Sequence, residues 1–336
     1  MDAKITKLRL SRLLSYDWLK IVGLATAGIL FWTLLFTMTA TRIKPSQQFT
    51  VFNYTCNNTL SNKFFTSFDD AMTGGVFSYE VIESTHNDLA STKDMAGTLL
   101  ETRLATDEGD VMFIPDLDDP ATAQEDENGQ TTYRYSYLES FAASWMPYIK
   151  NLSLTEEKGF FKQMENYLNA YYTEGYAKAD SLDESKVEAD FRARVKANKD
   201  KRFKKEEKIA QGVQDEIARI KKYQNALVNF YGYLEKGYVQ MTDIIVYSSE
   251  DPEKVLLQGT YGINLCPTGS TVMKGLSEIV GYQQEYTDPE TNETVSKTTA
   301  ENMNVMFFNL GVEEGFIYES LLYVNYIIES VCTELQ

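Results

Sequence analysis

Residues 94–117 read DMAGTLLETRLATDEGDVMFIPDL, and this stretch carries the pattern on which the fold prediction rests. A helix is predicted over 93–104, with Ser91 or Thr92 as its N-cap. After a glycine comes the compact apolar run 110–115, which has the length and composition of a buried strand. A helix that leads into a buried strand is typical of a sheet covered by helices.

The same alternation extends toward the N-terminus. A strand is predicted over 49–54 (FTVFNY), a helix over 63–72 that ends at two glycines, and a second strand over 76–83 (VFSYEVIE). Because strands and helices alternate and the strands are short and apolar, we expect a mainly parallel sheet with helices on its faces.

Toward the C-terminus, an acidic and turn-rich loop is predicted over 116–132, followed by mostly helical sequence. Apolar spacing predicts further helices over 133–149, 157–172, 185–198, 206–234 and 319–332, and strands over 243–247, 258–265 and 303–309. The last helix is apolar, but Glu319 and Glu329 interrupt it, and carboxylates are costly in lipid. We therefore expect it to pack in the protein.

A basic segment, 1–20, precedes an uncharged run of 21 residues from Ile21 to Thr41 (IVGLATAGILFWTLLFTMTAT). A helix of about 20 apolar residues crosses the hydrocarbon layer, so the run predicts a transmembrane signal anchor. The excess of basic residues before it predicts a cytoplasmic N-terminus and an extracytoplasmic remainder in a single-pass cell-membrane protein. A cleaved signal peptide is the alternative, although its apolar core is usually only about 7–15 residues long.

Residues 186–222 differ in charge from the rest of the chain, with 13 basic and 7 acidic residues. Their apolar positions predict a basic helical pair over 185–235. One interpretation is a solvated pair laid on the protein. The other is an electrostatic docking surface for an acidic partner or for anionic lipid headgroups.

Composition excludes several classes of function. The net charge of −17 argues against nucleic-acid binding. His86 is the single histidine, and the three cysteines stand too far apart for a zinc site or a disulfide framework. The nucleophile elbow, the P-loop, the dinucleotide fingerprint and the zinc-protease motif are all missing from the sequence. We therefore expect no enzymatic activity, no cofactor and no metal site.

The order of pieces resembles the extracytoplasmic solute-binding proteins of ABC transporters, which have a two-lobed type II periplasmic-binding fold. The similar pieces are FTVFNY, the helix that ends in GG, SYEVIEST and the helix–strand stretch quoted above. In that family a helix often ends in a short acidic, glycine-containing turn before a strand that begins Asp-Val and leads to the ligand cleft. The late segments TYGINL and NVMFFNLGVEEGFIYESLLYVNYII resemble the return strand and terminal helix.

The resemblance covers 47–117 and, less closely, 240–332, and it departs from the family in the transmembrane helix, because members are usually secreted or lipid-anchored. It implies an α/β, two-lobed fold with an inserted helical pair. The expected parts are a cytoplasmic segment (1–20), the anchor (21–41), a first lobe (46–117), a helical second-lobe region (118–239), and return strands with a terminal helix (240–336).

Ligands in open α/β sheets bind at the carboxyl ends of the strands. The predicted strand ends place Asn57, His86 and Asp116 in such a site. Each residue also has a simpler interpretation: Asn57 is a turn residue, His86 a helix cap or a solvated side chain, and Asp116 part of a solvated acidic loop.

Three aromatic residues, Trp145, Tyr148 and Tyr261, are candidates for stacking on a sugar ring. Trp145 stands out because Pro147 interrupts its helical stretch. Core packing is the alternative, since the chain has 22 tyrosines and 18 phenylalanines. The negative charge of the extracytoplasmic part argues against an anionic ligand and favours a neutral sugar or a peptide.

Two functions follow as hypotheses. The first is a membrane-anchored solute-binding protein that closes around a small solute and delivers it to an ABC transporter permease. The second is a structural or regulatory subunit of a cell-envelope complex that keeps the fold without a ligand and uses the basic helical pair to bind another subunit. An open polar and aromatic cleft favours the first hypothesis, and a filled one favours the second.

Overall fold

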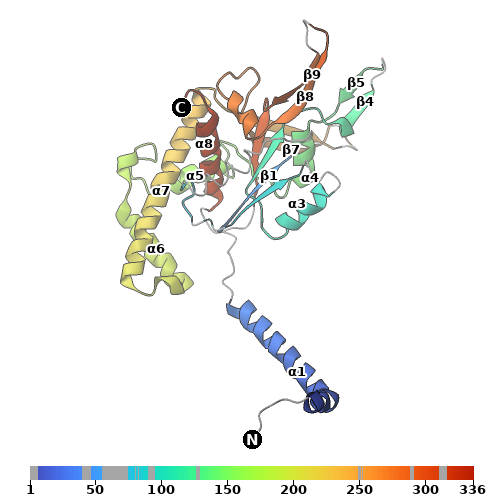
Figure 1. Ribbon diagram of the computed structural model, residues 1–336. Coiled ribbons are helices and arrows are strands. Elements are labelled where there is room, and N and C mark those ends of the chain that lie inside the picture. Colours follow the sequence, from blue (N-terminus) through green and yellow to red (C-terminus); the bar gives the residue numbers. More distant parts are fainter. Residues whose placement is uncertain are drawn as a thin grey trace. The chain divides into compact units, whose positions relative to one another are not determined.

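The computed structural model divides into two compact units, Met1–Lys44 and Pro45–Gln336 (Figure 1). The structure describes residues 7–39, 47–54, 75–79, 81, 83–89, 95–125, 129–248, 251, 253–287, 291–309 and 316–336. The predicted helix over 63–72 and the candidate residue Asn57 lie outside these ranges.

The first unit contains one helix, α1 (Lys7–Thr39). Its segment Trp18–Thr37 has 20 residues and a mean hydropathy of 1.9. Its large apolar side chains are exposed, and the hydroxyl of Thr33 donates a hydrogen bond to the carbonyl of Ile29 (2.8 Å) within the helix. An N-terminal apolar helix is thus confirmed, and its length and composition suit a membrane anchor or a signal sequence.

The second unit is built on a six-stranded mixed sheet with the order β2-β1-β3-β10-β7-β6. Strands β1, β2 and β3 are parallel, as predicted for this part of the chain, whereas β10, β7 and β6 join by antiparallel pairing. The strands are β1 (Gln48–Asn53), β2 (Glu83–Asp88), β3 (Val111–Pro115), β6 (Gln240–Tyr247), β7 (Val255–Asn264) and β10 (Met303–Phe307).

Two small hairpins stand apart from this sheet: β4 (Ala123–Glu125) with β5 (Thr131–Tyr133), and β8 (Tyr282–Thr287) with β9 (Thr294–Thr299). The described helices of this unit are α3 (Ala96–Leu104), α4 (Tyr137–Trp145), α5 (Phe160–Asn169), α6 (Glu184–Asn198), α7 (Glu206–Glu235) and α8 (Glu319–Val331). Single 3-10 turns lie at Pro120–Thr122, Ala179–Ser181, Lys201–Phe203, Lys274–Glu278 and Phe316–Tyr318.

Helices cover both faces of the sheet, with α5, α7 and α8 on one side and α3 and α4 on the other (Figure 1). Alternate residues of a strand point to opposite faces. In β3, Val111 and Phe113 belong to the larger apolar cluster under α5–α8, and Met112 and Ile114 to the smaller one under α3 and α4. The sheet is therefore buried between two helical layers, and the mixed α/β class is confirmed.

Strands from both 46–117 and 240–336 lie in this one sheet. The region 118–239 supplies α4 to one face and α5 and α7 to the other. The remaining sheets in the described part of the chain are the two hairpins. The two-lobed type II arrangement accordingly stays a prediction.

The strand predicted over 76–83 is wrong in its described part: residues 76–79 and 81 are not in a strand, and the strand is β2, Glu83–Asp88. Phe77 is drawn into the core instead, where its ring lies 4.7 Å from that of Phe49 and stacks on that of Tyr323 at 6.4 Å. Contacts with α8, which is far away in the sequence, thus decide the conformation of 77–79.

The two basic helices form as predicted, at Glu184–Asn198 and Glu206–Glu235. Each arginine of this pair has an acidic partner, as does one of its lysines. The pairs are Arg192 with Glu188 and Glu206, Arg194 and Arg219 with Glu216, Arg202 with Asp200, and Lys221 with Glu184.

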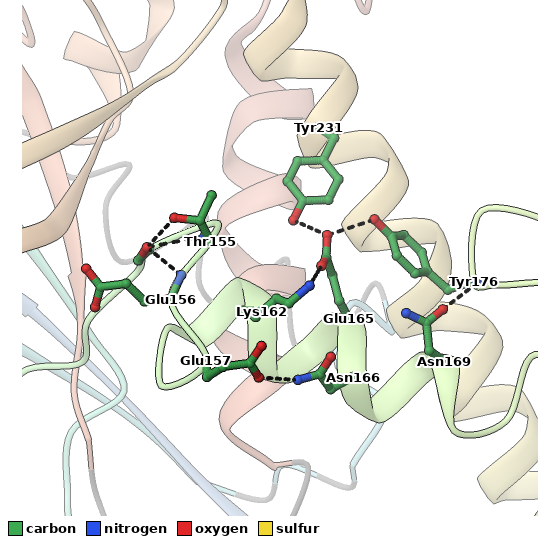
Figure 2. A network of polar contacts seen from close by, with 10 residues as sticks. Thr155, Glu156, Glu157, Lys162, Glu165, Asn166, Asn169, Tyr176 and Tyr231 are labelled. Carbon is green, nitrogen blue, oxygen red and sulfur yellow. Dashed lines mark hydrogen bonds and ion pairs between the residues drawn. The ribbon is translucent and has the colours of Figure 1, made fainter.

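Figure 2 shows the polar network that joins α5 to α7. The carboxylate of Glu165 accepts hydrogen bonds from the hydroxyls of Tyr231 (2.9 Å) and Tyr176 (3.1 Å) and pairs with Lys162 (3.2 Å). Burial, and then the neighbouring Glu165 carboxylate, raise the pKa of Tyr176 to about 12, so the phenol remains a donor at neutral pH. The network fixes the position of α5 on α7.

Two carboxyls lie in or beside the core. Glu319, the first residue of α8, is 0% exposed and accepts hydrogen bonds from the Ser78 amide (2.8 Å), the Ser78 hydroxyl and the Tyr223 hydroxyl (2.5 Å). Asp110 accepts one from the Thr50 amide (2.7 Å). Burial raises the pKa of Asp110 from 3.8 to about 8 and also raises the pKa of Glu319.

These shifts predict that stability falls as pH rises. An acid whose pKa is higher in the folded state than in the unfolded state stabilises fully below its unfolded pKa, and this contribution is lost as pH rises toward the folded value. For Asp110 the window runs from about pH 4 to 8. We expect Asp110→Asn to reduce the slope of unfolding free energy against pH there, by up to about 1.4 kcal/mol per pH unit.

The measurement is urea unfolding of residues 46–336 between pH 5 and about 9. Asp107→Asn is the matched control, because Asp107 is exposed three residues earlier. Equal slopes for Asp110→Asn and the unmodified domain would contradict the prediction.

Candidate functional site

A cavity of about 240 Å³ lies at the carboxyl ends of the parallel strands. Tyr54 directly follows β1 and Leu89 directly follows β2, while α3 and α4 form the sides. Its lining residues are Tyr54, Leu89, Ala96, Gly97, Leu100, Asp119, Tyr137, Ser140, Phe141, Ser144 and Trp145. In open α/β sheets, ligands bind outside the carboxyl ends of the strands, which is where this cavity lies.

Helix α4 presents one face to the cavity. A capping box fixes its start: the Ser136 hydroxyl accepts from the Glu139 amide (3.2 Å), and the Glu139 carboxylate accepts from the Ser136 amide (2.9 Å). The positions at 137, 140, 141, 144 and 145 then follow the three- and four-residue steps of a helix face. Of the eleven described residues that line the cavity, five come from this face.

Four of the described lining residues are aromatic: Tyr54, Tyr137, Phe141 and Trp145. The rings of Phe141 and Trp145 stack at 6.2 Å with an interplanar angle of 27°. Tyr54 and Tyr137 meet edge to face at 6.2 Å. Flat aromatic faces of this kind bind sugar rings and other ring-shaped solutes, because stacking removes the apolar C–H face of the solute from water.

Polar side chains also line the cavity, among them Asp119, Ser140 and Ser144. The Ser140 hydroxyl is buried and has no hydrogen-bond partner within the described residues. Asp119, which is 8% exposed, accepts a hydrogen bond from the Ala121 amide (2.9 Å). Because a buried hydroxyl without a partner is destabilising, Ser140 favours a bound group that offers a hydrogen bond.

One ionisable group beside the cavity has a shifted pKa. Burial, and more weakly the charge of Asp116, raise the pKa of Glu139, while its hydrogen bond with the Ser136 amide opposes this. The Glu139 carboxylate caps the N-terminus of α4 by accepting from the Ser136 amide, so it stabilises the helix and does not line the cavity. Among the described residues that line the cavity, Asp119 is the only charged one.

The six residues that the sequence suggested fall in different places. Trp145 lines the cavity, and the ring of Tyr148 lies 6.0 Å from it, outside the lining. Asp116 follows β3 and donates its amide to Asn302 (2.9 Å), away from the lining. Asn57 lies outside the described residues.

The expected position of His86 is wrong. It was placed after a strand, but its backbone lies inside β2, in register with Val51 of β1. The strand itself ends two residues later, at Asp88.

Tyr261 sits at an irregularity of the sheet. Thr242 pairs with Gly262 and Asp243 with Thr260, so Tyr261 is the extra residue of a β-bulge. The bulge turns its side chain into the smaller apolar cluster, where it is 9% exposed. It shares that cluster with Trp145 and Tyr148 but does not line the cavity.

Sequence reasoning missed Tyr54, Asp119, Tyr137 and Ser140. The spacing along α4 is the signal that points to two of them, because Tyr137 and Ser140 lie on the same face as Trp145. Tyr54 and Asp119 follow strand ends and are recognised only once the strands are placed.

A second hollow, of about 470 Å³, opens on the outer side of α7 and α8. The Tyr233 hydroxyl already donates to Glu329 there (2.6 Å). It lies away from the strand ends, and its lining polar pair is satisfied. Among the described residues, no group of three or more histidine, cysteine, aspartate and glutamate side chains is arranged to hold a metal ion.

The fold and cavity thus define a mixed α/β protein with an aromatic-walled hollow at its strand ends and an apolar N-terminal helix. Comparison with protein-family models, curated proteins and solved structures finds no match to this chain.

Proposed function

We propose that this chain is a membrane-anchored, extracytoplasmic solute-binding protein that delivers a small neutral solute to an ABC transporter permease. The observation that carries the proposal is the aromatic-walled cavity at the carboxyl ends of β1 and β2. The proposal includes the two-lobed type II fold and hinge closure that the resemblance implies.

The cavity supports a particular solute class. Its volume of about 240 Å³ is below the roughly 300–1,000 Å³ of drug-sized ligand sites, which favours one ring or one side chain. Stacked rings, the Ser140 hydroxyl and the Asp119 carboxylate suit a neutral polyol such as a monosaccharide, or part of a peptide. The protein's net charge of −17 disfavours anions. The protein acts by binding, without catalysis.

The apolar helix supports the anchoring part of the proposal. Trp18–Thr37 is long and apolar enough to cross a bilayer. The basic residues before it favour a cytoplasmic N-terminus and an extracytoplasmic second unit.

The test is a thermal-shift screen of residues 46–336 against neutral sugars, peptides, amino acids and metal ions. A ligand present at 100 times its Kd stabilises by about 2.7 kcal/mol, which raises Tm by a few degrees in a domain of this size. We expect a reproducible rise with neutral sugars or peptides. A flat response to every class would contradict solute binding.

A different observation favours the second candidate, a ligand-free subunit of a cell-envelope complex. The β6–β7 hairpin exposes four apolar side chains at the edge of the sheet, each 38–44% exposed: Ile245, Tyr247, Val255 and Leu256. Exposed apolar patches mark surfaces where other proteins bind. Chemical cross-linking that joins this hairpin to a membrane protein, together with a flat solute screen, would select this candidate.

A further inference from the structure

The turn between α6 and α7 concentrates positive charge. Residues 196–208, here called the basic tip, contain seven basic and three acidic residues. Six of the basic residues are exposed lysines for which the described residues provide no ion pair: Lys196, Lys199, Lys201, Lys204, Lys205 and Lys208.

These lysines differ from the other cations of the helical pair. The arginines of α6 and α7 are engaged with carboxylates, and the ammonium groups of Lys186 and Lys222 donate to backbone carbonyls. The other cations of the helical pair thus have partners within the protein, whereas the six tip lysines have no ion pair among the described residues. The remainder of the chain carries a net charge of −21.

The basic tip is a fixed structure. Lys199 ends α6 in a left-handed conformation (φ 49°), and the Asp200 carboxylate then caps the next turn by accepting from the Arg202 amide (2.9 Å). The ring of Phe203 packs edge to face on that of Phe191 at 5.1 Å. A Cβ at Gly212 would overlap Phe191 and come within 2.6 Å of Phe203, so the missing side chain leaves room for this packing.

We propose that the basic tip binds the anionic headgroups of the membrane in which the chain is anchored. Lysine is a strongly hydrated point charge without the planar fork of arginine. The one arginine of the tip, Arg202, is paired with Asp200, so the unpaired charge is carried by lysines, which suits a diffuse negative surface. Protein interfaces, in contrast, are depleted of lysine and enriched in arginine. Lipid is therefore favoured over an acidic protein as the occupant.

The anchor makes this contact effective, and the inference rests on that part of the proposed function. Seven residues, 40–46, separate α1 from the first described residue of the second unit, so they reach at most about 25 Å. The tether holds the domain near the bilayer at a high effective concentration. The strongly negative remainder is repelled by the same surface, so the basic tip is the part that turns toward the lipid.

The experiment uses the full chain in nanodiscs of phosphatidylcholine alone, or of phosphatidylcholine mixed with phosphatidylglycerol. Lysines are acylated briefly and quantified by mass spectrometry. We expect labelling of the tip lysines to fall by roughly threefold or more in anionic discs and to recover in about 1 M salt, where the Debye length is about 3 Å. Exposed lysines elsewhere serve as internal controls and keep their labelling: Lys158, Lys254, Lys274 and Lys297.

Two variants sharpen the test. Changing Lys199, Lys201, Lys204 and Lys205 to glutamine is expected to abolish the protection of Lys196 and Lys208. The matched variant with the four control lysines changed to glutamine keeps that protection.

Equal labelling of the tip in both kinds of disc overturns the inference. Protection in native membranes but in neither kind of disc overturns it in favour of a protein partner. Retention of the chain in the discs is measured separately, by gel filtration, so failure of the anchor is distinguished from failure of lipid binding. If the chain is not retained in the discs, both the membrane anchoring and the lipid binding by the basic tip are overturned. Solute binding by residues 46–336 is independent of all these results.

Discussion

Replacing Trp145 with alanine is expected to weaken binding of the solute found in the screen by about thirtyfold, or ~2 kcal/mol. Trp145 ends α4, lines the cavity and stacks on Phe141 at 6.2 Å. Removing the indole deletes the largest flat surface available to a ring-shaped solute. Isothermal titration calorimetry of residues 46–336 measures the loss directly.

Two comparisons separate this effect from damage to the fold. Trp145→Phe retains a stacking surface, so we expect it to lose only a few-fold in affinity. Tyr133→Ala removes an aromatic ring that is 43% exposed on β5 and lies outside the lining, and it leaves the affinity unchanged. An alanine variant at Trp145 that unfolds cooperatively and binds normally would remove Trp145 from the site.

Replacing Glu319 with alanine is expected to lower the free energy of unfolding by about 3–5 kcal/mol. The change removes the acceptor for the Ser78 amide, the Ser78 hydroxyl and the Tyr223 hydroxyl in a place from which water is excluded. It also leaves the nearby Arg219 guanidinium with less negative charge around it. Urea unfolding of residues 46–336 at pH 7 measures the difference.

Glu329→Ala is the matched control on the same helix. Glu329 is exposed and accepts one hydrogen bond, from the Tyr233 hydroxyl at 2.6 Å. We expect its loss to cost about 1 kcal/mol or less. Glu319→Gln keeps one acceptor oxygen but places an amide group against the remaining donors, so its cost should lie between the two. Similar costs for Glu319→Ala and Glu329→Ala would show that the buried network contributes little.

The sequence predicted long elements with regular apolar spacing well. The range 206–234 anticipated α7 to within one residue, because its apolar positions keep helical steps over its whole length. The strand at 110–115 was also found, since a buried strand between two helical layers is apolar at every position.

Elements fixed by distant contacts were missed. The segment 76–83 alternates like a strand, but the strand that pairs with β1 on the side away from β3 is the polar stretch ESTHND. Phe77 instead packs against Phe49 and Tyr323. The strands β8 (YQQEYT) and β9 (TVSKTT) are mostly polar and therefore give only a weak periodic signal, although Tyr282 is buried in the core. The polar sequence of β2 also explains why His86 was expected after a strand, although it lies inside one.

The candidate site was predicted in part. Trp145, which was singled out because a proline interrupts its helical stretch, lines the cavity, and its role in binding stays a prediction. Its neighbours in the cavity could be recognised only from the positions of α3 and α4 on the sheet. Tyr261 was chosen as an aromatic near a strand, and nothing in its local sequence indicates the bulge that turns it into the core.

The sheet order also determines when the protein is able to fold. Strand β10 lies between β3 and β7, and its first residue, Met303, pairs with Pro115. A ribosome therefore releases β1, β2 and β3 long before it makes the strand that covers their open edge. Until then β3 has an unpaired apolar edge, a state prone to aggregation. Completion of the sheet waits until Met303–Phe307 has been made, whereas the contacts between α6 and α7 join residues closer in the sequence and form earlier.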